Sequence, residues 1–150
     1  MTSGLKIFGH PAHPALVHFP IALWIVSLLW DGIGLVRGEP LWWAMSYWSL
    51  ALGLGFALPA MAAGYWDYFT IEVSAPAYRP ALRHALAMSS AAGAFLISLI
   101  ARGEALPPEG ARLILALASS SVGVALLAWG GWLGGTLVYR FGVGRDEGRS

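Results

Sequence analysis

The side chains with the clearest potential for chemistry are the four histidines, His10, His13, His18 and His84. Imidazole nitrogens ligate haem iron, and they also bind copper, zinc and iron ions outside a haem. The chain has no cysteine, which excludes disulfides, thiol catalysis, cysteine-ligated iron–sulfur clusters and covalently attached c-type haem. It also has no nucleophile–base–acid triad, phosphate-binding glycine loop or zincin motif. The residue types therefore favour a bound haem or metal ion.

A b-type haem held by His18 and His84 is the first interpretation of these histidines. His18 lies near the start of the first long apolar segment, and His84 lies near the start of the third. Helix bundles hold cofactors between side chains on facing helices, and both positions suit such a site. Arg83 is a candidate partner for a haem propionate through a charge-assisted hydrogen bond. The predicted cofactor-binding residues are therefore His18, His84 and Arg83.

A non-haem metal site is the alternative interpretation. Copper, zinc and iron all accept imidazole ligands, and the Asp67 carboxylate could complete the ligand set or orient a ligating histidine. The predicted metal ligands are then His10, His13, His18 and His84. Under the haem interpretation, His10, His13 and Asp67 instead surround the haem or form an adjacent quinone or metal site.

The distribution of charge predicts the elements that carry these residues. Asp, Glu, Lys and Arg make up only 11% of the 150 residues, and none occurs in 7–30, 40–66, 84–101 or 113–139. A bilayer-spanning helix needs roughly 20 mostly apolar residues. The sequence therefore predicts an all-α, four-helix integral membrane bundle over residues 1–141 and a polar tail over 142–150. The spans are expected at about 14–36, 40–65, 81–101 and 111–139.

Four spans place both chain ends and the 67–80 loop on one side of the membrane. All four histidines fall on that side. Most of the basic residues do so too, namely Lys6, Arg79, Arg83, Arg140, Arg145 and Arg149. The other side has Arg37, Arg102 and Arg112. The positive-inside rule then predicts cytoplasmic termini, in a multi-pass protein of the bacterial inner membrane.

Local signals refine the expected backbone of the first segment. Prolines follow His10 and His13 directly, and a residue before proline is biased away from the α region. We therefore expect both histidines in an extended, polyproline-like segment with their rings pointing the same way. We identify no internal repeat in the chain.

Glycines spaced four residues apart mark the fourth span. The pairs are Gly130/Gly134 and Gly131/Gly135. Such small-xxx-small spacing allows close approach of two helices, within the bundle or at a homodimer seam. The same bare face could make room for a flat macrocycle or a quinone ring.

Two distinctive motifs lie at the ends of the chain, GHPAHPALVHFPI at residues 9–21 and GWLGGTLVYRFGVG at residues 131–144. Together they resemble a bacterial family of four-helix membrane proteins of unknown function. Gly64 to Asp67 and His84 fit the same family, so the resemblance covers nearly the whole chain. Relatives are sometimes joined to Rieske-type iron–sulfur or cytochrome c domains. The resemblance therefore implies redox chemistry near the membrane, but it implies no ligand assignment.

Three functions follow as expectations. The first is a membrane electron-transfer subunit with one b-type haem between the first and third spans, working with a separate redox protein or a quinone. The second is a non-haem metal-binding membrane protein, and the third is a structural subunit of a larger membrane complex. A redox or binding subunit is favoured over a stand-alone enzyme. The net charge of +1 provides no basic stripe for a nucleic acid.

Overall fold

The computed structural model describes residues 4–103 and 107–144. A small antiparallel hairpin precedes the helices, with Lys6 opposite Pro11 and Ile7 opposite His10. The elements in chain order are β1 Lys6–Ile7, β2 His10–Pro11, α1 Ala12–Leu16, α2 His18–Arg37, α3 Pro40–Thr70, α4 Ala75–Arg102 and α5 Gly110–Tyr139.

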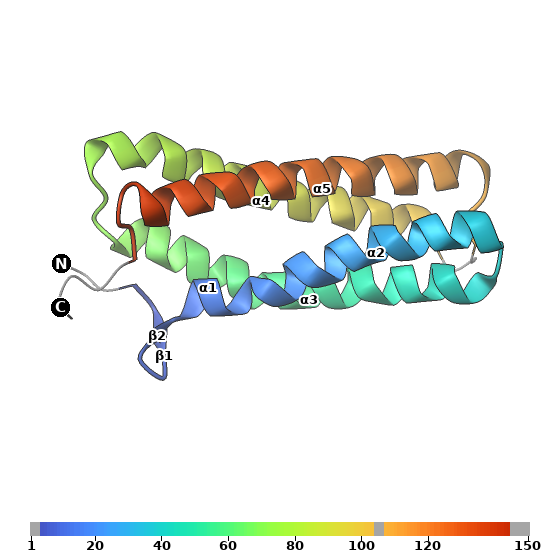
Figure 1. Ribbon diagram of the computed structural model, residues 1–150, viewed down its shortest axis with the longest axis horizontal. Helices are drawn as coiled ribbons and strands as arrows, with labels where there is room; N and C mark the ends of the chain where they lie inside the picture. The colour runs from blue at the N-terminus through green and yellow to red at the C-terminus, as the bar shows by residue number, and fades with distance from the viewer. Residues whose placement is uncertain (1–3, 104–106, 145–150) are drawn as a thin grey trace.

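The long helices confirm the all-α, four-helix membrane class. In the described part of the chain, four helical segments are long and apolar enough to cross a membrane: Ala12–Arg37, Pro40–Thr70, Ala75–Arg102 and Gly110–Tyr139. The first of these comprises α1 and α2. The four segments run side by side along the long axis of the molecule (Figure 1). The two ends of the described chain lie at the same end of the bundle (Figure 1).

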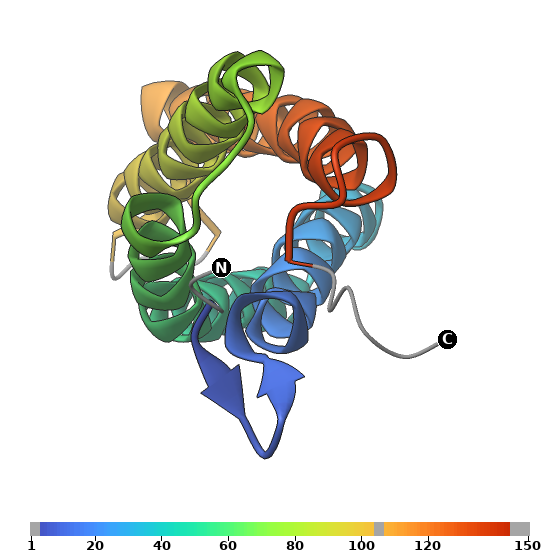
Figure 2. The same cartoon turned by 90° about the vertical axis from the view of Figure 1, so that its left-hand side faces the viewer.

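The bundle consists of two helical hairpins. α1 and α2 pack mainly on α3, and α4 packs mainly on α5. Viewed along the bundle, the order around the ring is α2, α3, α4 and α5, so that α2 lies diagonally opposite α4 (Figure 2). Side chains of α2 and α4 therefore meet across the centre of the bundle.

Two helices extend beyond the expected spans, and the prolines near the start of α4 do not prevent its extension. α3 continues to Thr70 and α4 already begins at Ala75, so the expected 67–80 loop shrinks to residues 71–74. Pro76 falls in the first turn of α4, where the missing N–H of proline has no intrahelical partner to lose. Pro80 lies further inside the helix, where its missing N–H removes one backbone hydrogen bond without ending the helix.

The extended conformation expected for both early histidines is found only for His10. His10 is in β2, whereas His13 is in the first turn of α1. Pro14 follows in the same turn and therefore does not interrupt the helix. The expectation that the two rings point the same way is wrong, because His10 is exposed and His13 is half-buried against α3.

The two hairpins are related by an internal repeat, which corrects the sequence-based expectation of none. Asp31 of α2 pairs with Arg102 of α4, 71 residues further along the chain. Trp24 stacks on Phe95 with ring centres 4.5 Å apart, at the same separation in sequence. The segment WIVSLL at residues 24–29 matches FLISLI at residues 95–100. Equivalent residues of the two hairpins thus contact one another across the bundle centre.

Candidate functional site

His13 and His84 face each other near the end of the bundle that holds the N-terminal hairpin. They too occupy equivalent positions of the repeat, one on α1 and the other on α4. Their ring centres are 6.2 Å apart and their ring planes are nearly perpendicular, at 88°. Both side chains are half-buried. The fold therefore brings together two imidazoles from the two different helical hairpins.

Backbone carbonyls hold the two rings in the same way. His13 Nδ1 lies 2.8 Å from the carbonyl oxygen of Ala60 on α3. His84 Nδ1 lies 2.8 Å from the carbonyl oxygen of Gly130 on α5. A carbonyl only accepts, so each Nδ1 must carry the proton and donate it. In the neutral form of each ring, Nε2 is then the unprotonated nitrogen, and its lone pair is available to a metal.

Two glycines lie against the faces of these rings. A Cβ atom at Gly64 would come within 2.7 Å of the His13 ring, and one at Gly134 would come within 3.0 Å of the His84 ring. Each glycine lies one helical turn beyond the carbonyl that holds the ring, since Gly64 follows Ala60 by four residues and Gly134 follows Gly130 likewise. A Cβ at Gly64 therefore has no room unless the His13 ring shifts, whereas one at Gly134 would make a tight contact with the His84 ring.

A small cavity adjoins His13. Its volume is about 30 Å³, enough for a single ion or water molecule. Its lining residues include Met61, Met88 and Trp24. The Trp24 Nε1 hydrogen is buried and has no hydrogen-bond partner within the described residues.

The other expected site residues do not join this pair. His18 is exposed, and its Nδ1 lies 3.4 Å from the Ala15 carbonyl of its own helical segment. His10 is exposed on β2, and Arg83 is exposed on α4. Asp67 accepts a hydrogen bond of 2.8 Å from the backbone N–H of Leu5, so it anchors the N-terminal segment to α3. In residues 4–103 and 107–144, no three His, Asp or Glu side chains gather as a metal-binding group.

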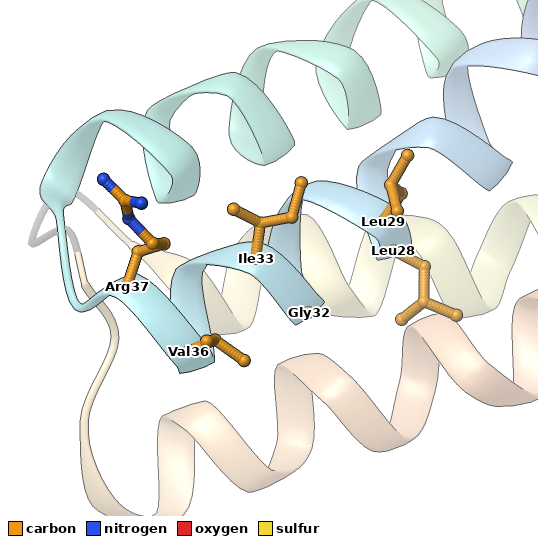
Figure 3. A pocket seen from close by; sticks show the side chains of 6 residues that line it. All are labelled: Leu28, Leu29, Gly32, Ile33, Val36 and Arg37. Carbon is orange, nitrogen blue, oxygen red and sulfur yellow. The ribbon is translucent and has the colours of Figure 1, made fainter.

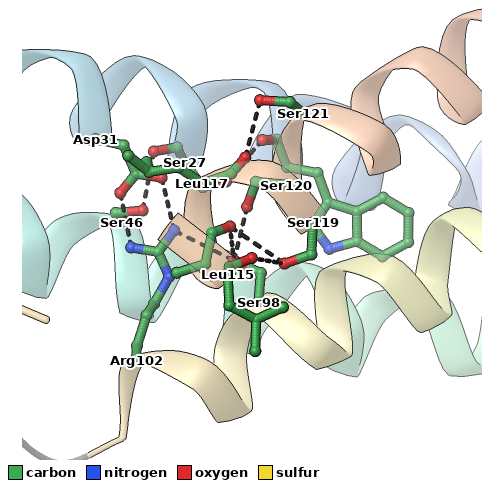
Figure 4. A network of polar contacts seen from close by, with 12 residues as sticks. Ser27, Asp31, Ser46, Ser98, Arg102, Leu115, Leu117, Ser119, Ser120 and Ser121 are labelled. Atoms are coloured by element: carbon green, nitrogen blue, oxygen red, sulfur yellow. Dashed lines mark hydrogen bonds and ion pairs between the residues drawn. The ribbon is translucent and has the colours of Figure 1, made fainter. Parts of the chain in front are cut away.

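A second polar centre, near the opposite end of the bundle, was not expected from the sequence. Arg102 donates from both terminal nitrogens to the Asp31 carboxylate, at 2.7 Å and 2.6 Å. Both side chains are essentially inaccessible. Figure 4 shows the serines around them. Arg102 was assigned to a loop on the far side of the membrane, and it instead points into the bundle.

An open apolar groove lies on α2, away from the histidines. Its volume is about 400 Å³. Figure 3 shows the residues that line it, namely Leu28, Leu29, Gly32, Ile33, Val36 and Arg37. Arg37 is already paired with Glu39 at 2.9 Å. The groove therefore offers an apolar, lipid-facing surface without an unpartnered charge.

The fold and these polar centres define a multi-pass integral membrane protein, embedded in a lipid bilayer through a four-helix bundle. A family model described as predicted membrane protein (DUF2231) matches residues 9–147, and the chain belongs to this family. No curated protein and no solved structure matches the chain significantly. The comparisons thus establish the membrane family.

Proposed function

We propose that this protein is a membrane electron-transfer subunit that binds one b-type haem between His13 and His84. The observation that carries the proposal is the facing pair of imidazoles, each with Nδ1 on a carbonyl and Nε2 available. His84 is retained from the sequence-based interpretation. His13 replaces His18, because His18 is turned away from the bundle.

The number of protein ligands favours haem over a bare metal ion. A haem supplies four equatorial nitrogens and needs only axial ligands from the protein, and histidine is a common choice. Structural zinc sites, in contrast, use four protein ligands, and catalytic sites use three. With metal–nitrogen bonds of about 2 Å, two imidazoles on one ion hold their ring centres roughly 6 Å apart. The observed 6.2 Å fits this separation. The adjoining cavity of about 30 Å³ does not hold a macrocycle, so the helices must move apart around His13 and His84 to admit a haem.

The chain itself would hold and tune the group. A bound haem supplies one-electron exchange. The carbonyls of Ala60 and Gly130 fix the orientation of the two rings and leave Nε2 as the nitrogen that would bind the iron. With His13 and His84 both holding the iron, the protein would leave no position open for oxygen or substrate. Electron transfer is the function that suits such a closed site. Arg83, one residue before His84, remains the candidate partner for a propionate.

A copper ion is the second candidate ligand, and one observation favours it. The cavity beside His13 is lined by Met61 and Met88, and thioether sulfurs prefer Cu(I). Met88 also follows His84 by one helical turn. Imidazoles and thioethers together would give a small-ion site that binds no macrocycle.

The burial of Arg102 strengthens the proposed orientation in the bacterial inner membrane. Arg102 is paired with Asp31 inside the bundle, so it is not one of the positive charges of the loops. The far side then keeps Arg37 and Arg112, against Lys6, Arg79, Arg83 and Arg140 among the described residues of the histidine side. We infer that the histidine side is cytoplasmic. A separate redox protein or a quinone at this face would be the electron partner, and a homo-oligomer is compatible with the lipid-facing groove.

Visible spectroscopy tests the proposal. The protein is expressed with haem precursor supplied, purified in mild detergent, and measured before and after dithionite. We expect sharp α and β bands on reduction and one haem per chain. His13→Ala and His84→Ala should each lose these bands, whereas the matched control His18→Ala should keep them.

Each other outcome assigns the site differently. A colourless protein would overturn the haem proposal, and bound copper that falls in Met61→Leu and Met88→Leu would support the second candidate. A haem lost in His18→Ala but kept in His13→Ala would restore the pairing first expected from the sequence.

A further inference from the structure

The tip of the N-terminal hairpin is strained and carries an exposed aromatic ring. Phe8 and Gly9 form the two-residue turn between β1 and β2, and both have positive φ, at 50° and 80°. Two-residue hairpin turns with positive φ at both positions favour the sequences Asn-Gly and Gly-Gly, because most other residues have a strained backbone at positive φ. Phe8 is nevertheless 98% exposed. Neither the turn nor the packing of the described residues accounts for a phenylalanine here.

Hydrogen bonds attach this hairpin firmly to the bundle. The backbone N–H of Leu5 donates to Asp67 at the end of α3. The backbone N–H of Ala12, where α1 begins, donates to the Leu5 carbonyl at 2.8 Å. The hairpin is thus fastened at its base, and the position of its tip is set by the bundle.

The hairpin projects sideways from the bundle rather than along its axis. Figures 1 and 2 show β1 and β2 extending outward beside α1, close to the level at which α3 ends. If the bundle axis follows the membrane normal, the tip lies in the plane of the membrane surface. Exposed aromatic rings mark this same end of the helices: Trp66, Phe69, Tyr78, Trp132 and Tyr139. Aromatic belts of this kind lie at the headgroup level of a bilayer.

We propose that the hairpin is a lateral membrane anchor that inserts Phe8 into the interfacial zone of the lipid bilayer. Transfer of the exposed ring out of water offsets the strain of its backbone. Ile7, also exposed, adds apolar surface beside it. Because β2 continues directly into α1, the anchor also fixes the helix that carries His13. The anchoring depends on lipid alone and is independent of any haem or metal.

Site-directed spin labelling tests this anchor, and the absence of cysteine makes each introduced cysteine unique. A nitroxide is attached to Phe8→Cys in the full chain, reconstituted in vesicles of phosphatidylcholine and phosphatidylglycerol. Ser74→Cys, exposed in the loop before α4, is the water-side reference, and Leu58→Cys, exposed on α3, is the lipid-side reference. The rate at which the nitroxide collides with oxygen, which prefers lipid, is compared with the rate at which it collides with a water-soluble nickel complex.

We expect the label at position 8 to collide more with oxygen and less with nickel than the Ser74→Cys label, moving toward the Leu58→Cys values. Equal accessibility at positions 8 and 74 would overturn the anchor. It would leave Phe8 as a surface for a partner protein, which is absent from the vesicles. The Phe8→Asn variant, which suits positive φ, should fold normally, with a circular dichroism spectrum equal to that of the unchanged chain.

Discussion

Asp31 and Arg102 connect the two hairpins through a buried, bidentate ion pair near the end of the bundle opposite His13 and His84. Asp31 and Arg102 are 71 residues apart, as are His13 and His84, so both pairs join equivalent positions of the internal repeat. Ser98 also accepts a hydrogen bond of 3.3 Å from Arg102, and Ser98 shares a hydrogen bond with Ser120 of α5. Ionisable side chains are costly at membrane depth and occur there in pairs. This pair therefore fixes how α2 and α4 face each other.

Removing one partner of this pair should strongly destabilise the bundle. Asp31→Asn leaves the buried Arg102 guanidinium without its counter-charge, which typically costs about 3–5 kcal/mol. We expect a lower midpoint of thermal unfolding in detergent. The double variant Asp31→Leu/Arg102→Met removes both charges and should recover most of the loss, because apolar replacement of a whole buried pair is often neutral. Equal losses in the single and double variants would contradict this interpretation.

Gly134 should be essential for the site although it carries no functional group. In Gly134→Ala, the new Cβ meets the His84 ring at 3.0 Å, so the ring must shift by a few tenths of an ångström and its hydrogen bond to Gly130 is disturbed. Gly131→Ala on the same helix is the matched control, because nothing lies within 4 Å of its added Cβ. We expect Gly134→Ala to lose bound haem and Gly131→Ala to keep it, with equal helix content by circular dichroism.

Gly64 provides the same test in the other hairpin. A Cβ at this position would meet the His13 ring at 2.7 Å, whereas one at Gly55 of the same helix meets nothing within 4 Å. Gly64→Ala should therefore lower haem content, measured by the absorbance of the reduced protein per mole of chain, and Gly55→Ala should not. Haem retention in both Gly64→Ala and Gly134→Ala would place the cofactor elsewhere.

The sequence predicted the spans and the gathering of histidines at one end, but not which of them would meet. His13 and His18 are five residues apart, so on a regular helix they point about 140° away from each other. Only one of them can face the bundle centre. The residues buried along α2 are Pro20, Trp24, Ser27, Asp31 and Gly34. Continued backward at the same spacing, this series reaches His13 rather than His18.

The ion pair and the repeat were missed for related reasons. Asp31 is an ionisable residue inside an apolar segment, which by itself indicates a buried partner. Arg102, at a helix end, looked like an ordinary loop charge. The repeat replaces Trp24 with Phe95 and Asp31 with Arg102, so few identities are conserved, although the contacts across the bundle are. These replacements can be recognised as matching pairs only in the folded structure, where the two helical hairpins contact each other.

The perpendicular arrangement of the two rings leads to a spectroscopic prediction. Hydrogen bonds from Nδ1 to Ala60 and Gly130 hold the His13 and His84 planes at 88° to each other. Perpendicular axial imidazoles leave two iron d orbitals nearly equal in energy, whereas parallel rings separate them. We expect the ferric protein to be low-spin, with a strongly anisotropic electron paramagnetic resonance signal dominated by one low-field feature. A rhombic three-line signal would show that haem binding turns the rings parallel. A high-spin signal would show that one histidine is not a ligand.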